Sequence, residues 1–168
     1  MIALGIDPGT AITGYGIVKD APDGRLSEIC YGVIRTDSKT PHSLRLKQIH
    51  DGITLLIEQY KPQVAAIEQL FFSRNAATAL AVGQARGVVI LTGVLAGLEL
   101  FEYTPIQVKE AVTGYGRAEK MQIQQMVKVL LGLAEIPKPD DAADALALAI
   151  CHLHSYRMRG VMSVGSEI

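Results

Sequence analysis

The sequence has few of the residues on which several kinds of protein depend. Its 168 residues include two cysteines, Cys30 and Cys151, which provide neither a disulfide framework nor the spacing of a cysteine metal site. It has no tryptophan and only three phenylalanines, so it offers no broad aromatic platform for single-stranded bases. Its net charge of −1 shows no basic excess for general nucleic-acid binding, but acids that hold cations would mask such an excess, so the total charge decides nothing.

We also expect neither a targeting segment nor a membrane span. The first residues enter an apolar strand without a basic leader or a cleavage site, so we expect no secretory signal and a cytoplasmic location. The run over 76–98 is long enough to suggest a membrane span, but Gln84 and Arg86 at its middle would be costly in lipid. We interpret it as a buried helix of a protein that does not associate with membranes.

The hydrophobic pattern predicts one α/β domain. Strands are expected over 2–6, 10–18, 26–35, 64–67 and 100–103. Helices are expected over 41–59, 76–98, 118–131 and 140–156, with a further short helix before the loop at 113–116. Three strands in sequence, then alternating helices and strands, predict a three-layer fold with a mixed five-stranded sheet and helices on both faces. We expect the domain to cover 1–157 and a short, disordered tail to cover 158–168.

Two acidic residues stand at the ends of predicted strands. Asp7 ends the first strand before Pro8 and Gly9, and Glu68 ends the fourth. An aspartate before a Pro-Gly turn is as consistent with a turn cap as with a catalytic group. If the two strands are parallel neighbours, however, both carboxylates lie side by side at one edge of the sheet.

Two further acids share one face of the last helix. Asp141 and Asp144 stand three residues apart, and Asp140 directly precedes them. Helix capping and the helix dipole explain Asp140 and Asp141, but Asp144 lies among alanines and leucines with no neighbouring Lys or Arg. A metal ion is therefore a candidate partner. Clustered carboxylates select Mg²⁺ or Mn²⁺, and two such ions about 4 Å apart would suit phosphodiester cleavage.

Several short motifs occur in order along the chain: Gly5-Ile6-Asp7-Pro8-Gly9, Thr13-Gly14-Tyr15-Gly16, Ile67-Glu68-Gln69, Gly83-Gln84-Ala85-Arg86-Gly87, Ala118-Glu119-Lys120 and Asp141-Ala142-Ala143-Asp144-Ala145. With these motifs the chain resembles the bacterial RuvC family of Holliday-junction resolvases, which have the ribonuclease-H-like fold. A strand-borne aspartate followed by glycine also occurs in sugar-kinase and actin-like folds, but those need two such domains. The resemblance extends from Asp7 to about His154.

The resemblance implies a function and a set of ligands. It maps the four metal-binding acids of the family onto Asp7, Glu68, Asp141 and Asp144, with His in place of Asp141 in some relatives. It implies a Mg²⁺-dependent homodimer that nicks two opposed strands of a four-way junction and leaves 5′-phosphates and 3′-hydroxyls. It also implies two Mg²⁺ ions per site, with Mn²⁺ able to substitute, a T-rich cleavage preference and cooperation with the RuvA and RuvB branch-migration proteins.

Five residues are candidates for DNA contact. Lys109, Arg117 and Lys120 flank the loop at Gly114–Gly116, where they could grip phosphates or simply decorate solvated helix faces. The resemblance favours Lys109 and Lys120, and we include Lys120 among the catalytic residues. Arg74 is a further candidate. Phe71 matches a family aromatic that stacks on an opened base, although it could instead pack in the core.

The helix over 76–98 predicts a dimer, because its apolar residues lie on several faces and the sheet can cover only one. A neighbouring helix of the same chain is the alternative cover. Two other functions remain open from the residues: a ribonuclease-H-like nuclease acting on RNA or another DNA structure, and a non-catalytic module that binds junctions. The four clustered acids argue against the second, since a binding module has no use for carboxylates that repel one another.

Overall fold

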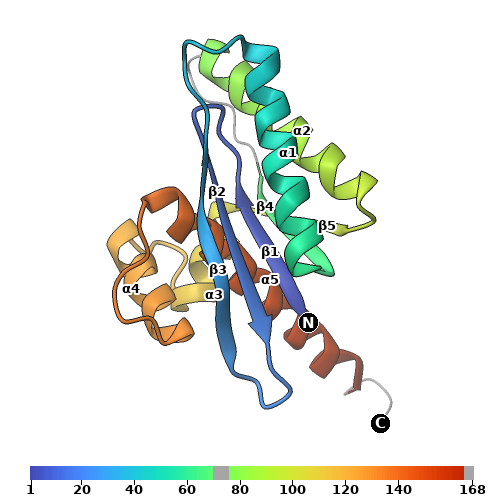
Figure 1. Cartoon of the computed structure of the whole chain (residues 1–168). Coiled ribbons are helices and arrows are strands. Elements are labelled where there is room, and N and C mark those ends of the chain that lie inside the picture. Colours follow the sequence, from blue (N-terminus) through green and yellow to red (C-terminus); the bar gives the residue numbers. More distant parts are fainter. Residues whose placement is uncertain (70–75, 165–168) are drawn as a thin grey trace.

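The computed structural model describes residues 1–69 and 76–164. Its elements are β1 (Ile2–Asp7), β2 (Ile12–Asp20), β3 (Leu26–Arg35), α1 (His42–Tyr60), β4 (Val64–Glu68), α2 (Ala76–Leu95), β5 (Glu99–Tyr103), α3 (Pro105–Thr113), α4 (Lys120–Leu131) and α5 (Asp140–Val164). Helices α1 and α2 lie on one side of the sheet and α3, α4 and α5 on the other (Figure 1). The predicted three-layer α/β fold is confirmed.

The sheet has five strands in the order β3-β2-β1-β4-β5. Strands β1, β2 and β3 form an antiparallel meander, whereas β4 runs parallel to β1 and β5 parallel to β4. In the β1–β4 register, Ile6 pairs with Ile67. Asp7 and Glu68 therefore follow at the same edge of the sheet, as the sequence predicted for parallel neighbours.

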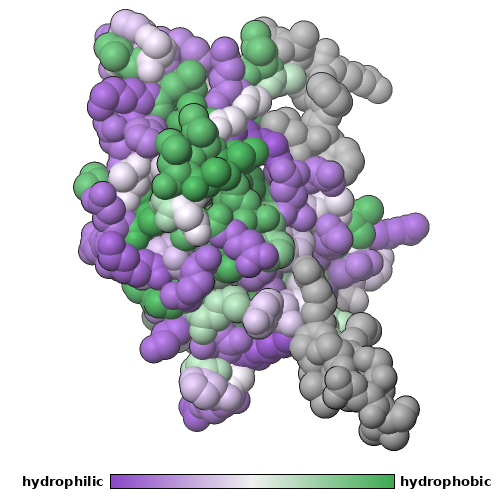
Figure 2. Space-filling view, turned by 90° about the vertical axis from the view of Figure 1, so that its right-hand side faces the viewer, coloured by the Kyte–Doolittle hydropathy of each residue, from purple (hydrophilic) through white to green (hydrophobic). Residues whose placement is uncertain are grey.

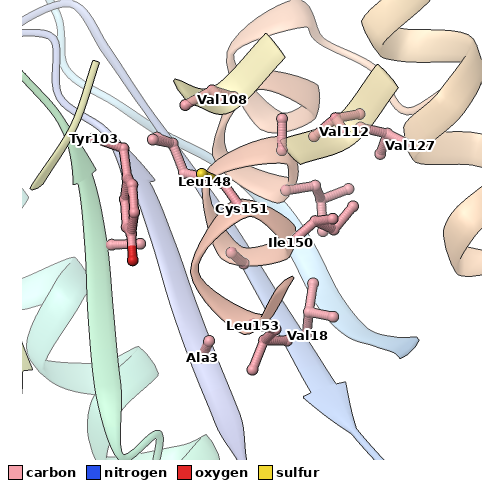
Figure 3. Close-up of a cluster of buried hydrophobic side chains, with 14 of the residues drawn as sticks. Ala3, Val18, Tyr103, Val108, Val112, Val127, Leu148, Ile150, Cys151 and Leu153 are labelled. Atoms are coloured by element: carbon pink, nitrogen blue, oxygen red, sulfur yellow. The ribbon is translucent and has the colours of Figure 1, made fainter. Parts of the chain in front are cut away.

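Alternate residues of the central strands enter two separate cores. On one face, Leu4, Ile6 and Ile67 pack against α1 and α2. On the other, small residues such as Ala3 and Ala66 meet α5, whose Leu148, Ile150 and Leu153 contribute to a core completed by α3 and α4 (Figure 3). A buried aliphatic side chain of this kind stabilises the fold by about 1.5–3 kcal/mol.

Three glycines allow α5 to lie directly on β1 and β2. A Cβ added at Gly5 would come 2.8 Å from the Ala149 nitrogen, and one at Gly16 would come 2.8 Å from side-chain carbons of Leu146. A Cβ at Gly14 would overlap the carbonyl group of Asp141. The absence of side chains at these positions brings the acidic first turn of α5 against the ends of β1 and β2.

Three helix boundaries differ from the sequence predictions by two residues or more. Helix α2 ends at Leu95 and not at Leu98, because Gly97 adopts a positive φ of 75° that terminates it. Helix α4 begins at Lys120, where Glu119 and Gln122 form a capping box. Helix α5, predicted to end near Tyr156 before a tail, continues to Val164. Its continuation is supported by Arg157, which pairs with Asp20 at the end of β2, while 165–168 lie outside the described residues.

No helix in the ranges 1–69 and 76–164 is long and apolar enough to cross a membrane. Helix α2 is continuous through Gln84 and Arg86, the two polar residues that argued against a membrane span.

Candidate active site

A cavity of about 200 Å³ opens where the parallel strands β1 and β4 end. Its walls carry Asp7 from β1, Glu68 from β4, Lys109 from α3, Lys120 from α4 and Asp144 from α5. Pro105, Val108, Ile123 and Leu148 supply an apolar part of the lining. Five elements far apart in the sequence thus bring three acids and two lysines around one hollow.

The pKa of Asp7 is raised from 3.8 to about 7, mainly by burial and then by the negative charges of Asp144, Glu68 and Asp141. Burial also raises the pKa of Glu68, and the charge of Asp144 adds to this effect. Neighbouring carboxylates therefore make ionisation of Asp7 and of Glu68 more costly. The group therefore holds negative charge that a cation would neutralise.

Lys120 supplies one positive charge to this group. Its Nζ lies 3.1 Å from Asp144 Oδ2 and 3.2 Å from Asp140 Oδ2. Burial raises the pKa of Asp144, and the hydrogen bond from Lys120 works against that increase. The sequence argument that no Lys or Arg lies near Asp144 was wrong, because it considered only neighbours along the helix. Helix α4 places Lys120 beside Asp144 in the wall of the cavity.

The two remaining acids at the start of α5 differ in their surroundings. Asp140 accepts a hydrogen bond from Gln124 at 3.0 Å, and the bonds from Lys120 and Gln124 lower the pKa of Asp140. Asp141 lies opposite Gly14, the β2 residue that pairs with Asp7. Its negative charge is one of those that raise the pKa of Asp7, so all four predicted acids interact.

The chemistry of these residues fits a hard divalent cation, because every acidic donor is a carboxylate oxygen and the carboxylates repel one another. The carboxylates lie farther apart than those of a preformed metal site. Among the residues described here, no group of three His, Cys, Asp or Glu side chains is close enough to hold a metal ion. Asp144 is paired with Lys120 instead.

The predicted DNA contacts are distributed unevenly. Lys109 lines the cavity because Thr104 and Gln107 form a capping box that starts α3 directly after β5. Arg117 is exposed in the segment between α3 and α4 and does not line the cavity. Arg74 and Phe71 lie outside the described residues, so their predicted roles stay predictions.

Sequence reasoning assigned no role to Arg86. This residue of α2 lines a second cavity of about 230 Å³, which adjoins the first through Asp7, Glu68 and Pro105 and is also lined by Val82 of α2. Its position in the middle of an apolar helix was the available signal, since an arginine there needs partners.

Comparison with known proteins identifies the family. The family model described as crossover junction endodeoxyribonuclease RuvC matches residues 3–152. A protein of that name from Desulforamulus reducens is 58% identical over 152 residues, which cover 90% of this chain and 93% of the relative. Another from Heliobacterium modesticaldum is 57% identical, with 92% of this chain and 95% of the relative covered.

Solved structures agree in sequence and in fold. The Thermus thermophilus RuvC structure is 35% identical, with a TM-score of 0.88 and coverage of 95% of this chain and 97% of that one. The structure of T. thermophilus RuvC in complex with a Holliday junction substrate gives a TM-score of 0.90 at 35% identity, covering 95% and 96% of the two chains. With its five-stranded mixed sheet and its carboxylate-lined cavity, the chain belongs to the RuvC family of crossover junction endodeoxyribonucleases.

Proposed function

We propose that this chain resolves four-way DNA junctions by two symmetric nicks, each made at the cavity between Asp7, Glu68 and Asp144. Its family membership makes it a crossover junction endodeoxyribonuclease of recombination and repair. The proposal for the cutting site rests on one observation: these three acids and Lys120 line the same cavity at the edge of the sheet. A cluster of repelling carboxylates favours a metal-dependent nuclease over a module that only binds junctions.

The four acids would hold two Mg²⁺ ions, with Mn²⁺ able to substitute. When bound, such ions stabilise the attacking and leaving oxygens of the phosphodiester. Asp7 and Glu68 hold their carboxylates at adjacent strand ends, and Asp141 and Asp144 approach from the first turns of α5. The Lys120 ammonium faces the same space and can oppose the negative charge that builds on the phosphate during cleavage.

A second copy of the chain is the partner that symmetric nicking requires. Leu80, Leu91, Val94 and Leu95 of α2 are exposed, with Leu95 at 72%, although α1 already packs against part of this helix. Figure 2 shows a continuous hydrophobic area on the side of the molecule where α1 and α2 lie. Burial of these side chains in an isologous interface would pair two cavities, which matches the two-fold symmetry of the junction.

Other features follow from the family and stay proposals for this chain. Lys109, with its side chain at the cavity, and the exposed Arg117 would bind phosphates beside the cutting site, and Arg74 is a further candidate. Phe71 would stack on a base at the opened centre of the junction. We also propose cooperation with RuvA and RuvB, a T-rich cleavage preference and a cytoplasmic location.

Cleavage of three substrates tests the proposed function. The purified protein is incubated with a four-way junction, a linear duplex of the same sequence and an RNA–DNA hybrid, with Mg²⁺ and with EDTA. Only the junction in Mg²⁺ should be cut, at opposed positions that leave ends a ligase can rejoin. Cleavage of the hybrid at a similar rate would favour the ribonuclease-H-like alternative. Junction binding without cleavage in Mg²⁺ or Mn²⁺ would favour the binding module.

A further inference from the structure

Arg86 is an almost buried cation in a helix that is otherwise mostly apolar. Its side chain is 15% exposed, and its neighbours Ala85 and Val89 belong to the core under α2. A guanidinium at such a depth is costly unless its N–H groups have partners. The identity of those partners therefore indicates what the residue does.

The partners of Arg86 lie at the ends of two neighbouring strands. Its Nε donates to the backbone carbonyl of Glu68 at 3.3 Å, and its Nη2 lies 2.7 Å from Glu102 Oε1. Strands β4 and β5 pair in parallel at this level, with Ile67 opposite Glu102. One planar side chain thus connects α2 to the last residue of β4 and to β5.

Helix α2 also contacts the segment that follows the other strand-borne acid. The Thr10 hydroxyl, three residues after Asp7, donates to the carbonyl of Ala81 at 2.9 Å. The segment that follows β1 and the last residue of β4 are therefore both hydrogen-bonded to α2. Arg86 makes the second of these connections and lines the cavity on the α2 side of the two acids.

We propose that Arg86 is a positioning residue that fixes the end of β4, and with it the Glu68 carboxylate, relative to Asp7. It contacts the main chain of Glu68 and acts through this ligand, not on the phosphate. This inference rests on the proposed function, in which Glu68 helps to hold the metal ions. Residues that orient metal ligands through hydrogen bonds typically change metal affinity or activity by about 10- to 100-fold when replaced.

The test compares Arg86→Lys and Arg86→Gln with the wild-type protein. Lysine keeps the charge but cannot span Glu68 and Glu102 with a planar fork, so both variants should lose kcat by about 10-fold or more. The KM for the junction, and junction binding in EDTA, should stay unchanged. The rise in melting temperature caused by Mg²⁺ on the protein alone should need a correspondingly higher Mg²⁺ concentration.

Two further variants make the result specific. Glu102→Gln leaves Arg86 in place but removes its ion pair, so it should shift the Mg²⁺ response in the same direction by a smaller factor, even if the Arg86 variants fold poorly. Arg157→Lys is the matched control, because it alters another arginine–carboxylate pair, several turns of α5 beyond Asp144. It should leave the Mg²⁺ response at the wild-type value.

Several results would overturn the inference. A wild-type kcat and Mg²⁺ response in Arg86→Lys would show that the planar guanidinium is not needed to position Glu68. A loss of junction binding that parallels the loss of kcat would show that Arg86 contacts DNA. An equal shift in Arg157→Lys would reduce the effect to general stability. If the wild-type protein itself cuts no junction, the proposed function fails, whereas normal wild-type cutting with unaffected variants rejects only the role of Arg86.

Discussion

Lys120 of α4 donates a hydrogen bond to Asp144 of α5 over 3.1 Å, although the two residues are 24 positions apart in the sequence. Both residues line the cavity that Asp7 and Glu68 also line. It gives Lys120 two possible effects on the site: attraction of the phosphate and control of the Asp144 carboxylate. Both effects depend on the positive charge at this position.

Replacing Lys120 with Ala should therefore slow cleavage more than it weakens junction binding. Loss of a group that opposes developing negative charge typically costs about 100- to 1000-fold in kcat. The measurement is single-turnover cleavage of a four-way junction alongside a binding titration. Lys128→Ala, on the same helix but outside the cavity lining, is the control. Unchanged cleavage in Lys120→Ala would show that this lysine is an ordinary solvated side chain.

Gly14→Ala should displace the acidic turn of α5, because the added Cβ would overlap the carbonyl group of Asp141. We expect cleavage to fall by at least tenfold and the Mg²⁺ requirement to rise, since misplaced ligands weaken metal binding. The matched control is Gly83→Ala, where an added Cβ meets nothing within 4 Å. Wild-type cleavage by Gly14→Ala would mean that α5 adapts without moving Asp141.

The pair between Arg157 and Asp20 should make stability depend on pH in acid. The hydrogen bond from Arg157 holds the pKa of Asp20 below its usual value, so the pair stabilises the folded state above the unfolded pKa of about 3.9. This contribution is lost as the pH falls through the lower, folded pKa.

Urea unfolding at pH 7, 5 and 3 checks this expectation. Arg157→Gln should unfold at a lower urea concentration than the wild type at pH 7, and the difference should shrink at pH 3. Arg25→Gln is the control, because its pair with Asp23 is largely exposed, at 88% and 51%, and should contribute little at any pH. A difference for Arg157→Gln that does not change with pH would rule out the ion pair as its cause.

Leu91→Glu should give a folded monomer that makes few paired nicks. Leu91 is 57% exposed on α2, and a charge there would be buried without a partner in the proposed interface. Ala81, equally suitable from the sequence, is a poorer choice because it is partly buried and its carbonyl accepts from Thr10. Val129→Glu, an exposed position on α4, is the control.

Sedimentation measures this outcome. The wild type and Val129→Glu should be dimers at micromolar concentration, and Leu91→Glu should be a monomer with a normal circular dichroism spectrum. A wild-type monomer that still makes paired nicks would contradict the proposed interface.

The sequence was sufficient to predict the elements that carry the acids. Strand β3 has the predicted bounds, Leu26–Arg35, because the Pro22–Gly24 turn separates it clearly from β2. Asp7 and Glu68 could be placed side by side since each ends an apolar run and parallel strands end at a common edge. The bounds of β3 and the acids at the ends of β1 and β4 could be predicted because each depends on a short, local stretch of the sequence.

Contacts between helices could not be read in the same way. The partner of Asp144 is Lys120, and that of the Glu68 carbonyl is Arg86, and both depend on how α4 and α2 pack. The sequence also could not predict which face of α2 is exposed, because apolar residues surround this helix. Only tertiary packing decides that Ala85 is buried and Leu91 exposed.

The most direct test of the account is the mapping of nicks on a four-way junction by the wild type and by Asp7→Asn. Asparagine keeps the shape of the side chain but removes a charge from the group of acids, so paired nicking in Mg²⁺ should be lost. Junction binding should persist or become tighter, because one negative charge near the phosphates is gone. Nicks by Asp7→Asn at the wild-type positions and near the wild-type rate would contradict the proposal that these carboxylates hold the catalytic metal ions.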